Sequence, residues 1–306
     1  MSIIHLFRTL NRWFFDSVDT WGLTIFRIAM GLVAINKILF LYPELVYWYS
    51  NEGIVSLTTS FTSQLSGGLN LFYTLRDFDS VTVAYALWTL ALVSATTFTL
   101  GLGTRVSALV LYVVMVSFDH RNTYVLQGGD ALIRVMLFWM IFARSNGYHS
   151  VDRAIAQAKG RRIPTQQSAW PLRALQIQLA LMYLGTFLHK SEGPTWWNGS
   201  AVYIVSQLID FNRYPLPLAY ANWTFVKLMT WGALLFEGLF PLLIWFRETR
   251  RYLLVFGIVF HLVLEWHISI PIFQVASLAA YAVFLERDDW EALKRLVRRR
   301  PPVTPG

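Results

Sequence analysis

Long apolar segments with few charges recur along the whole chain, and this pattern constrains the fold more than any other feature. A helix needs about 20 apolar residues to cross a bilayer. Eight segments approach or reach this length, at about 22–42, 81–103, 105–118, 129–144, 172–189, 223–246, 252–266 and 271–286. Only 14% of the residues are charged, against about 25% in an average soluble domain. We therefore predict an all-α fold, a polytopic membrane helical bundle of about eight transmembrane helices.

The placement of lysine and arginine predicts how this bundle is oriented. Cytoplasmic loops of membrane proteins are enriched in these residues, and 18 of the 26 lie on the side of the N-terminus when the eight segments alternate. The opposite side carries Arg76, Arg121, Lys190 and Arg213. The remaining four lie within segments and are Arg27, Lys37, Arg134 and Lys227. Both termini are thus expected in the cytoplasm, with 287–306 as a basic cytoplasmic tail near the anionic leaflet.

Nothing in the sequence divides the chain into parts. There is no internal repeat, low-complexity tract or sizeable soluble segment, so 1–306 is predicted to be a single membrane domain with a core over 15–286. The chain has no cysteine, which excludes disulfides and thiolate metal sites. No secretory signal pattern is present, so the first segment is expected to remain in the mature protein. The net charge of +8 fits basic cytoplasmic loops, and no nucleic-acid partner is predicted.

The outer side carries three loops rich in aromatic residues, at 43–80, 119–128 and 190–222. Loops this long and apolar are expected to fold back as amphipathic or re-entrant helices that cover the outer face of the bundle. Such a cover encloses a pocket. An aromatic belt at the membrane interface explains the same residues without a pocket, and the sequence leaves both readings open.

Lys190 is the leading candidate for a functional residue. It ends an apolar helix within YLGTFLHKSEGPTWWNGSAVY, residues 183–203, and is followed at once by two tryptophans. Desolvation disfavours the ammonium form, so a lysine at such a place can act as a base near neutral pH. We expect His189, Trp196 and Trp197 to lie around its substrate.

Ionisable residues within the segments are expected to be paired or functional. Asp130 and Arg134 are four residues apart on one helical face, which predicts a salt bridge between them. Arg27 and Lys37 lie near segment ends and are expected to extend toward the interface.

Glu237 and His261 lie near the middle of their segments, and Glu265 shares a helical face with His261. Together with Asp130 and Arg134, these three residues are predicted to face inward as a buried polar network, with a direct functional role of the three as the alternative. The spacing of His261 and Glu265 suits two metal ligands, but the sequence offers no further strong ligand, so no metal is predicted.

Five sequence blocks carry a resemblance to a known family. They are FRIAMGL, RNTYVLQGGDALIRVMLFWMIF, QIQLALMYLGTFLHKSEGPTWWNGSAVYI, FEGLFPLLI and FHLVLEWHISIPIFQVASLAAYAVF. In this order they resemble the HTTM domain, the membrane portion of vitamin K-dependent gamma-carboxylase and its bacterial relatives. The resemblance covers about 15–286, is most specific around Gly128–Asp130 and Lys190, and implies a bacterial inner (plasma) membrane protein.

The resemblance implies a role for Lys190. In the carboxylase, a lysine at the corresponding helix end deprotonates reduced vitamin K, whose anion reacts with oxygen. A strong base forms, removes a proton from a glutamate gamma carbon, and the carbanion captures carbon dioxide. Lys190 would be the base, and reduced vitamin K or menaquinone the cofactor.

The second half of that reaction is less well matched. The carboxylase histidine that assists the carbanion precedes a tyrosine that aligns with Tyr124, so Asn122 lies near its place and His120 two residues earlier. The resemblance therefore makes His120 and Asn122 catalytic candidates and places Tyr124 in the quinone pocket. The lumenal domain of the carboxylase has no counterpart in this sequence. The substrate is then small, is recognised by a partner, or the reaction stops at quinol oxygenation.

The sequence thus leads to two hypotheses of different classes. The first is a gamma-carboxylase-like integral membrane enzyme that uses a reduced quinone and oxygen for carboxylation or epoxidation-linked modification at the extracytoplasmic face. The second is a non-catalytic membrane protein for maturation, export or binding of a secreted peptide toxin or a lipid, as some bacterial HTTM proteins are associated with such peptides. Expected partners are the lipid bilayer, a quinone, and a peptide or protein substrate. A transporter ranks third, because no inverted repeat is visible.

Overall fold

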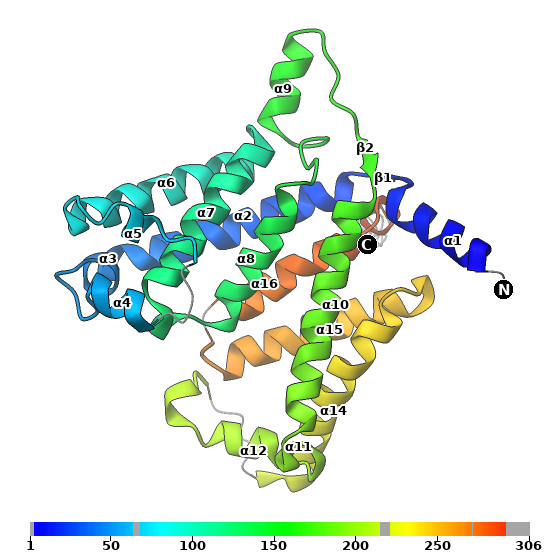
Figure 1. Cartoon of the computed structure of the whole chain (residues 1–306). Coiled ribbons are helices and arrows are strands. Elements are labelled where there is room, and N and C mark those ends of the chain that lie inside the picture. Colours follow the sequence, from blue (N-terminus) through cyan, green and yellow to red (C-terminus); the bar gives the residue numbers. More distant parts are fainter. Residues whose placement is uncertain (1–2, 64–67, 215–220, 271, 292–306) are drawn as a thin grey trace, which may run out of the picture.

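The computed structural model describes residues 3–63, 68–214, 221–270 and 272–291 as a bundle of helices with one small sheet (Figure 1). The longer helices are α1 (Ile3–Phe15), α2 (Trp21–Leu41), α6 (Ser80–Leu100), α7 (Thr104–Arg121), α8 (Gly128–Met140), α9 (Val151–Ala158), α10 (Trp170–Ser191), α14 (Trp223–Leu243), α15 (Arg247–His267) and α16 (Phe273–Ala280). The predicted break at Pro271 and the tail beyond residue 291 lie outside the described residues.

Each of the eight apolar segments coincides with a helix, so the helical fold class is confirmed. Within the described ranges, three helical stretches are long and apolar enough to cross a membrane: Trp21–Tyr49, Ser80–Leu100 and Trp223–Leu243. A shorter apolar helix runs over Phe273–Phe284. The chain therefore has the helices of an integral membrane protein, and the number of eight crossings stays a prediction.

Short helices form much of the loops that were expected to fold back. They are α3 (Leu45–Tyr49), α4 (Leu57–Ser63), α5 (Leu71–Thr74), α11 (Pro194–Trp197) and α12 (Ala201–Ser206), with the 3-10 turns η1 (Tyr42–Glu44), η2 (Thr123–Val125) and η3 (Ile209–Phe211). A further 3-10 turn, η4 (Tyr281–Phe284), continues α16 outside these loops. In Figure 1, α3–α5 gather at one end of α2, α6 and α7, and α11 and α12 at one end of α10 and α14. Asp79 ends the first group by capping α6: its carboxylate accepts the Thr82 N–H at 2.7 Å, and this bond lowers the pKa of Asp79.

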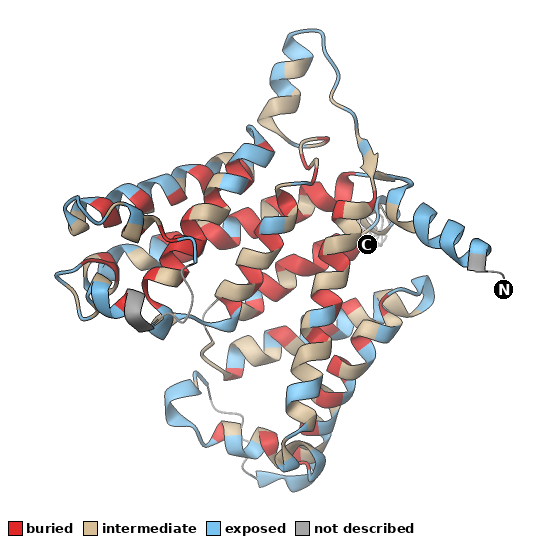
Figure 2. Ribbon diagram, viewed as in Figure 1, coloured by how far each residue is buried: buried red, intermediate tan, exposed pale blue. Residues whose placement is uncertain are grey.

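Helix α2 lies at the centre of the bundle and packs against α6, α8 and α16. Its side chains Leu23, Phe26 and Met30 are fully buried, and buried positions follow α2 along its length in Figure 2. A Cβ on Gly31 would overlap Thr99 of α6. Because lipid is as apolar as the core, such close backbone approach through small residues, rather than water exclusion, holds membrane helices together.

The N-terminal end of α2 is fixed by polar contacts. Strands β1 (Ser17–Asp19) and β2 (Gln166–Ser168) pair antiparallel and bring the starts of α2 and α10 together. Arg27 does not extend to the interface as expected, because it is fully buried. Its guanidinium donates to the carbonyl oxygens of His149 at 2.6 Å and Phe98 at 3.4 Å. Phe98 lies in the last turn of α6, where carbonyls carry partial negative charge and accept such a cation well.

Gly101 and Gly103 provide a matched test of this packing. Both have a positive φ, of 78° and 57°. A Cβ at Gly101 would overlap Arg27, whereas one at Gly103 would meet nothing within 4 Å. We expect Gly103→Ala to cost about 1 kcal/mol through backbone strain, and Gly101→Ala to cost clearly more because Arg27 has to move. Thermal unfolding of the purified protein in detergent measures both, and equal losses would contradict this account of Arg27.

Candidate functional site

Lys190 lies in the last turn of α10, and the chain turns back over it directly afterwards. Pro194 starts α11, where a missing backbone N–H costs nothing. This places the ring of Trp196 with its centre 4.7 Å from Lys190 Nζ, within cation–π range. Trp197 points elsewhere: it is 59% exposed, and its Nε1 donates to the Ser191 carbonyl. Trp196 therefore lies over the amine, and Trp197 stabilises the turn after α10.

The partner of the Lys190 amine is Glu237 of α14. Lys190 Nζ lies 2.6 Å from Glu237 Oε1, a short charge-assisted hydrogen bond. The Glu237 side chain is 6% exposed and that of Lys190 26%. The second carboxylate oxygen, Oε2, is buried and accepts no hydrogen bond from any described residue. The pair thus keeps acceptor capacity that the protein itself does not use.

Both residues line a pocket of about 370 Å³, here called the Lys190 pocket. Six helices contribute described residues to its walls, represented by Met182 of α10, Trp196 of α11, Val205 of α12, Met229 of α14, Phe260 of α15 and Phe273 of α16. The lining is almost entirely apolar. A mostly apolar concave site with a few convergent polar groups is the usual form of a small-molecule site.

A second polar group lines this pocket and is completely buried. His261 Nδ1 lies 2.5 Å from Gln274 Oε1, and His261 Nε2 lies 2.7 Å from the Tyr183 hydroxyl. For a neutral ring, Nδ1–H then donates to Gln274 and Nε2 accepts from Tyr183. The Tyr183 oxygen is also 2.5 Å from the hydroxyl of Tyr281. Tyr183 precedes Lys190 by seven residues, two turns or about 10 Å along the same face of α10.

Asp130 and Arg134 do not pair with each other as predicted. Lys37 Nζ lies 2.6 Å from Asp130 and 3.4 Å from Asp119, and Arg134 lies 3.2 Å from the other oxygen of Asp119. The structure therefore buries Lys37, expected at the interface, in a group that joins α2, α7 and α8. Lys37, Asp119 and Asp130 also line a separate pocket of about 330 Å³ together with Asn122.

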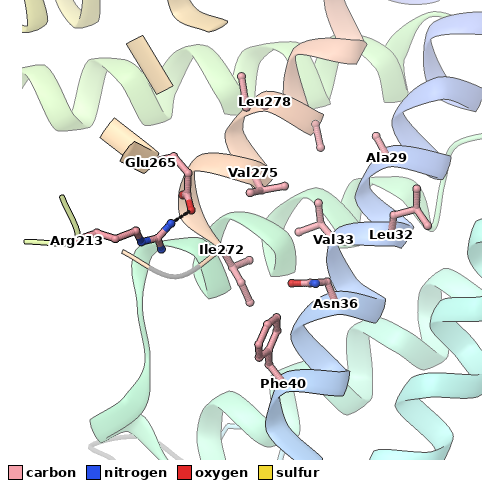
Figure 3. Close-up of a pocket in the computed structure, with 11 residues that line it drawn as sticks. Ala29, Leu32, Val33, Asn36, Phe40, Arg213, Glu265, Ile272, Val275 and Leu278 are labelled. Carbon is pink, nitrogen blue, oxygen red and sulfur yellow. Dashed lines mark hydrogen bonds and ion pairs between the residues drawn. The ribbon is translucent and has the colours of Figure 1, made fainter. Parts of the chain in front are cut away.

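Glu265 is likewise separate from Glu237 and His261. It pairs with Arg213 at the side of another pocket, of about 940 Å³. Figure 3 shows this pair facing apolar side chains such as Val33 of α2 and Val275 of α16. We call this pocket the α2–α16 groove. The five residues predicted as a buried polar network thus belong to three different groups.

The remaining predicted site residues lie away from the Lys190 pocket. His120 Nδ1 contacts the Leu69 carbonyl at 3.0 Å, and the Asn122 side chain donates to the Trp48 carbonyl at 3.1 Å. Tyr124 is 68% exposed, and His189 is exposed as well. Of the four residues predicted for the quinone pocket, Trp196 alone lines the Lys190 pocket. The described residues contain no group of three or more potential metal ligands.

Tyr183 and Gln274 were not recognised from the sequence. The seven-residue spacing of Tyr183 and Lys190 signals that both project from one face of α10. Gln274 has no such signal, because its role depends on how α15 and α16 meet.

Comparison with known proteins identifies a family. A family model described as "HTTM domain" matches residues 15–290, which confirms the resemblance seen over 15–286. No curated protein and no solved structure matches the chain.

The unequal burial of Lys190 and Glu237 predicts unequal effects on stability. Lys190→Met leaves a buried carboxylate unpaired, and we expect a loss of about 3 kcal/mol. Glu237→Gln leaves an ammonium that can turn toward the pocket opening, at a cost of about 1 kcal/mol. The double variant should recover part of the Lys190→Met loss, because it leaves no unpaired charge. Unfolding of the three variants in detergent measures this, and strictly additive losses would rule the coupling out.

Proposed function

The chain belongs to the HTTM domain family, and we propose that it is an integral membrane enzyme of the vitamin K-dependent gamma-carboxylase type. In this proposal a reduced quinone, menaquinone or vitamin K, binds in the Lys190 pocket at the extracytoplasmic face. The protein lies in the inner membrane of a bacterium, with both termini in the cytoplasm. One observation carries the proposal: the amine of Lys190, with its carboxylate partner, faces an apolar pocket of ligand size.

The lining fits the chemistry of a quinol. A quinol ring is flat, apolar on both faces and polar at its two hydroxyl oxygens. Phe260 and Phe273 offer aromatic walls, and Lys190 and the Tyr183–His261 pair offer polar groups to the same pocket. The volume of about 370 Å³ falls within the range of about 300–1,000 Å³ typical of small-molecule sites.

Glu237 gives Lys190 a way to become a base. An ammonium and a carboxylate in contact hold one ionisable proton between them, and the charged form loses its advantage when water is excluded. A ligand that fills the pocket removes water from Lys190, so the proton moves from Nζ to the adjacent Glu237 Oε1. The neutral amine then accepts a proton from a ligand hydroxyl. Trp196 lies over the amine and shields it from the outside.

The deprotonated quinol, when bound and supplied with oxygen, would provide the strong base that drives modification of a second substrate. The chain's own residues bind and orient the ring and hold the first proton. His120 and Asn122 contact backbone carbonyls outside this pocket, so the proposal gives them no proton transfer. This favours epoxidation-linked chemistry over glutamate carboxylation.

A second function is favoured by the α2–α16 groove. Its volume of about 940 Å³ and its apolar lining suit an extended apolar chain of a lipid or a secreted peptide. In this alternative the protein binds or matures a peptide without catalysis. Val275→Trp, which fills the groove, would then abolish biological activity, and Lys190→Met would leave it unchanged.

Turnover with a reduced quinone tests the leading function. The purified protein is incubated with reduced menaquinone or vitamin K, oxygen and carbon dioxide, and mass spectrometry detects epoxide and carboxylated product. We expect Lys190→Met to lower epoxide formation by about 10²–10⁴-fold, the usual contribution of a general base. Glu237→Gln should lower it as well, because the acceptor for the lysine proton is removed.

Lys227→Met is the matched control. Lys227 lies near the N-terminal end of α14, and its Nζ lies 5.9 Å from the ring centre of Trp231. It does not line the Lys190 pocket. It should retain the turnover of the unaltered protein. Equal turnover by the Lys190 and Lys227 variants, or none by the unaltered protein with any quinol, would overturn the proposal.

A further inference from the structure

The N-terminal helix α1 has two chemically different faces. Its sequence, IIHLFRTLNRWFF, places apolar residues three and four positions apart, which is the spacing of one helical stripe. That stripe is formed by Leu6, Phe7, Leu10, Trp13 and Phe14. The opposite face carries His5, Arg8, Thr9 and Arg12, and α1 contains no acidic residue. A helix of this kind needs an apolar surface on one side and tolerates anions on the other.

The described residues leave most of the apolar stripe uncovered. Figure 1 shows α1 projecting from the body, and Figure 2 shows it exposed along most of its length. Phe7 is 74% exposed, and Leu6 and Leu10 are exposed as well. Contiguous apolar exposure of this sort marks an interaction site.

In the part of the chain that the structure describes, the C-terminal end of α1 is held by the bundle. The Trp13 ring lies edge-on to Trp245 with ring centres 5.7 Å apart, and the Arg173 guanidinium lies 4.7 Å from the Trp13 ring centre. The Asp16 carbonyl accepts the Ala169 N–H at 3.0 Å. These contacts fix the direction in which α1 leaves the bundle.

Helix α1 lies close to the membrane surface. Phe15 precedes Trp21, the first residue of a candidate membrane span, by six positions. An extended chain covers at most about 3.5 Å per residue, so α1 ends within about 20 Å of the point where this span enters the bilayer. The span begins on the side that holds most of the basic residues, and the inner leaflet carries anionic lipid there.

We propose that α1 is an interfacial anchor that lies in the plane of the inner leaflet and binds anionic lipid. Its apolar stripe, centred on Phe7 and Leu10, sinks among the acyl chains. Arg8 and Arg12 pair with lipid phosphate or carboxylate groups at the headgroup level. The proposal does not depend on the function of the Lys190 pocket.

Single cysteines test this cleanly, because the chain has none. Phe7→Cys and Thr9→Cys place one fluorophore on each face of α1, and neither side chain contacts the bundle core. The full-length protein is reconstituted in vesicles of phosphatidylethanolamine and phosphatidylglycerol, or of phosphatidylcholine alone. Quenching is measured with a lipid that carries a shallow nitroxide and with aqueous iodide.

The proposal predicts opposite quenching at the two positions. In anionic vesicles the label at position 7 should be quenched several-fold more by lipid nitroxide than by iodide, and the label at position 9 the reverse. Arg8→Gln with Arg12→Gln should reduce this difference in anionic vesicles and leave it unchanged in phosphatidylcholine. Equal iodide access at both positions would overturn the proposal. So would shielding of position 7 from both quenchers with energy transfer between copies, which identifies a second copy as the occupant.

Discussion

An ionisable side chain buried among apolar helices has to find its partner within the protein, because lipid offers none. Most of the long-range architecture follows from this constraint. The pairings that involve a buried group are Arg27 with two backbone carbonyls, Lys37 and Arg134 with Asp119 and Asp130, and Lys190 with Glu237. Each joins elements that are far apart in the sequence. Together they specify which helices meet where apolar packing alone discriminates little.

The same constraint separates structural groups from the candidate site. In the Lys37 group both oxygens of Asp119 face a cation, and Asp130 also accepts the Gln127 N–H at 2.8 Å. That group is internally satisfied. Among the described residues, Glu237 Oε2 is buried and has no hydrogen-bond partner. Glu237 Oε1 pairs with the Lys190 amine, and both residues line a pocket. An unsatisfied acceptor beside an apolar cavity is where a ligand gains most from binding.

Much of the helical fold could be predicted from the sequence, whereas the contacts between helices could not. Hydropathy located the helices because a run of apolar residues within one segment is enough to predict a buried or membrane-spanning helix. The position of Lys190 after an apolar run, and of Glu237 deep within one, indicated residues that need partners. Sequence spacing shows which residues share a helical face, as for Asp130 and Arg134, but not which neighbouring helix that face meets. Asp130 therefore pairs with Lys37 of another helix and not with Arg134. His120 and Asn122, which were assigned by resemblance, lie outside the Lys190 pocket.

In the proposed complex, a quinol ring occupies the space between Lys190, Tyr183 and His261. A photoreactive naphthoquinol, activated in membranes that contain the full-length protein and mapped by mass spectrometry, tests it most directly. Our account predicts labelled peptides from α10, α14 and α15 around the Lys190 pocket, with protection by reduced menaquinone. Labelling confined to α2 and α16, in the α2–α16 groove, or labelling that menaquinone does not reduce, would contradict it.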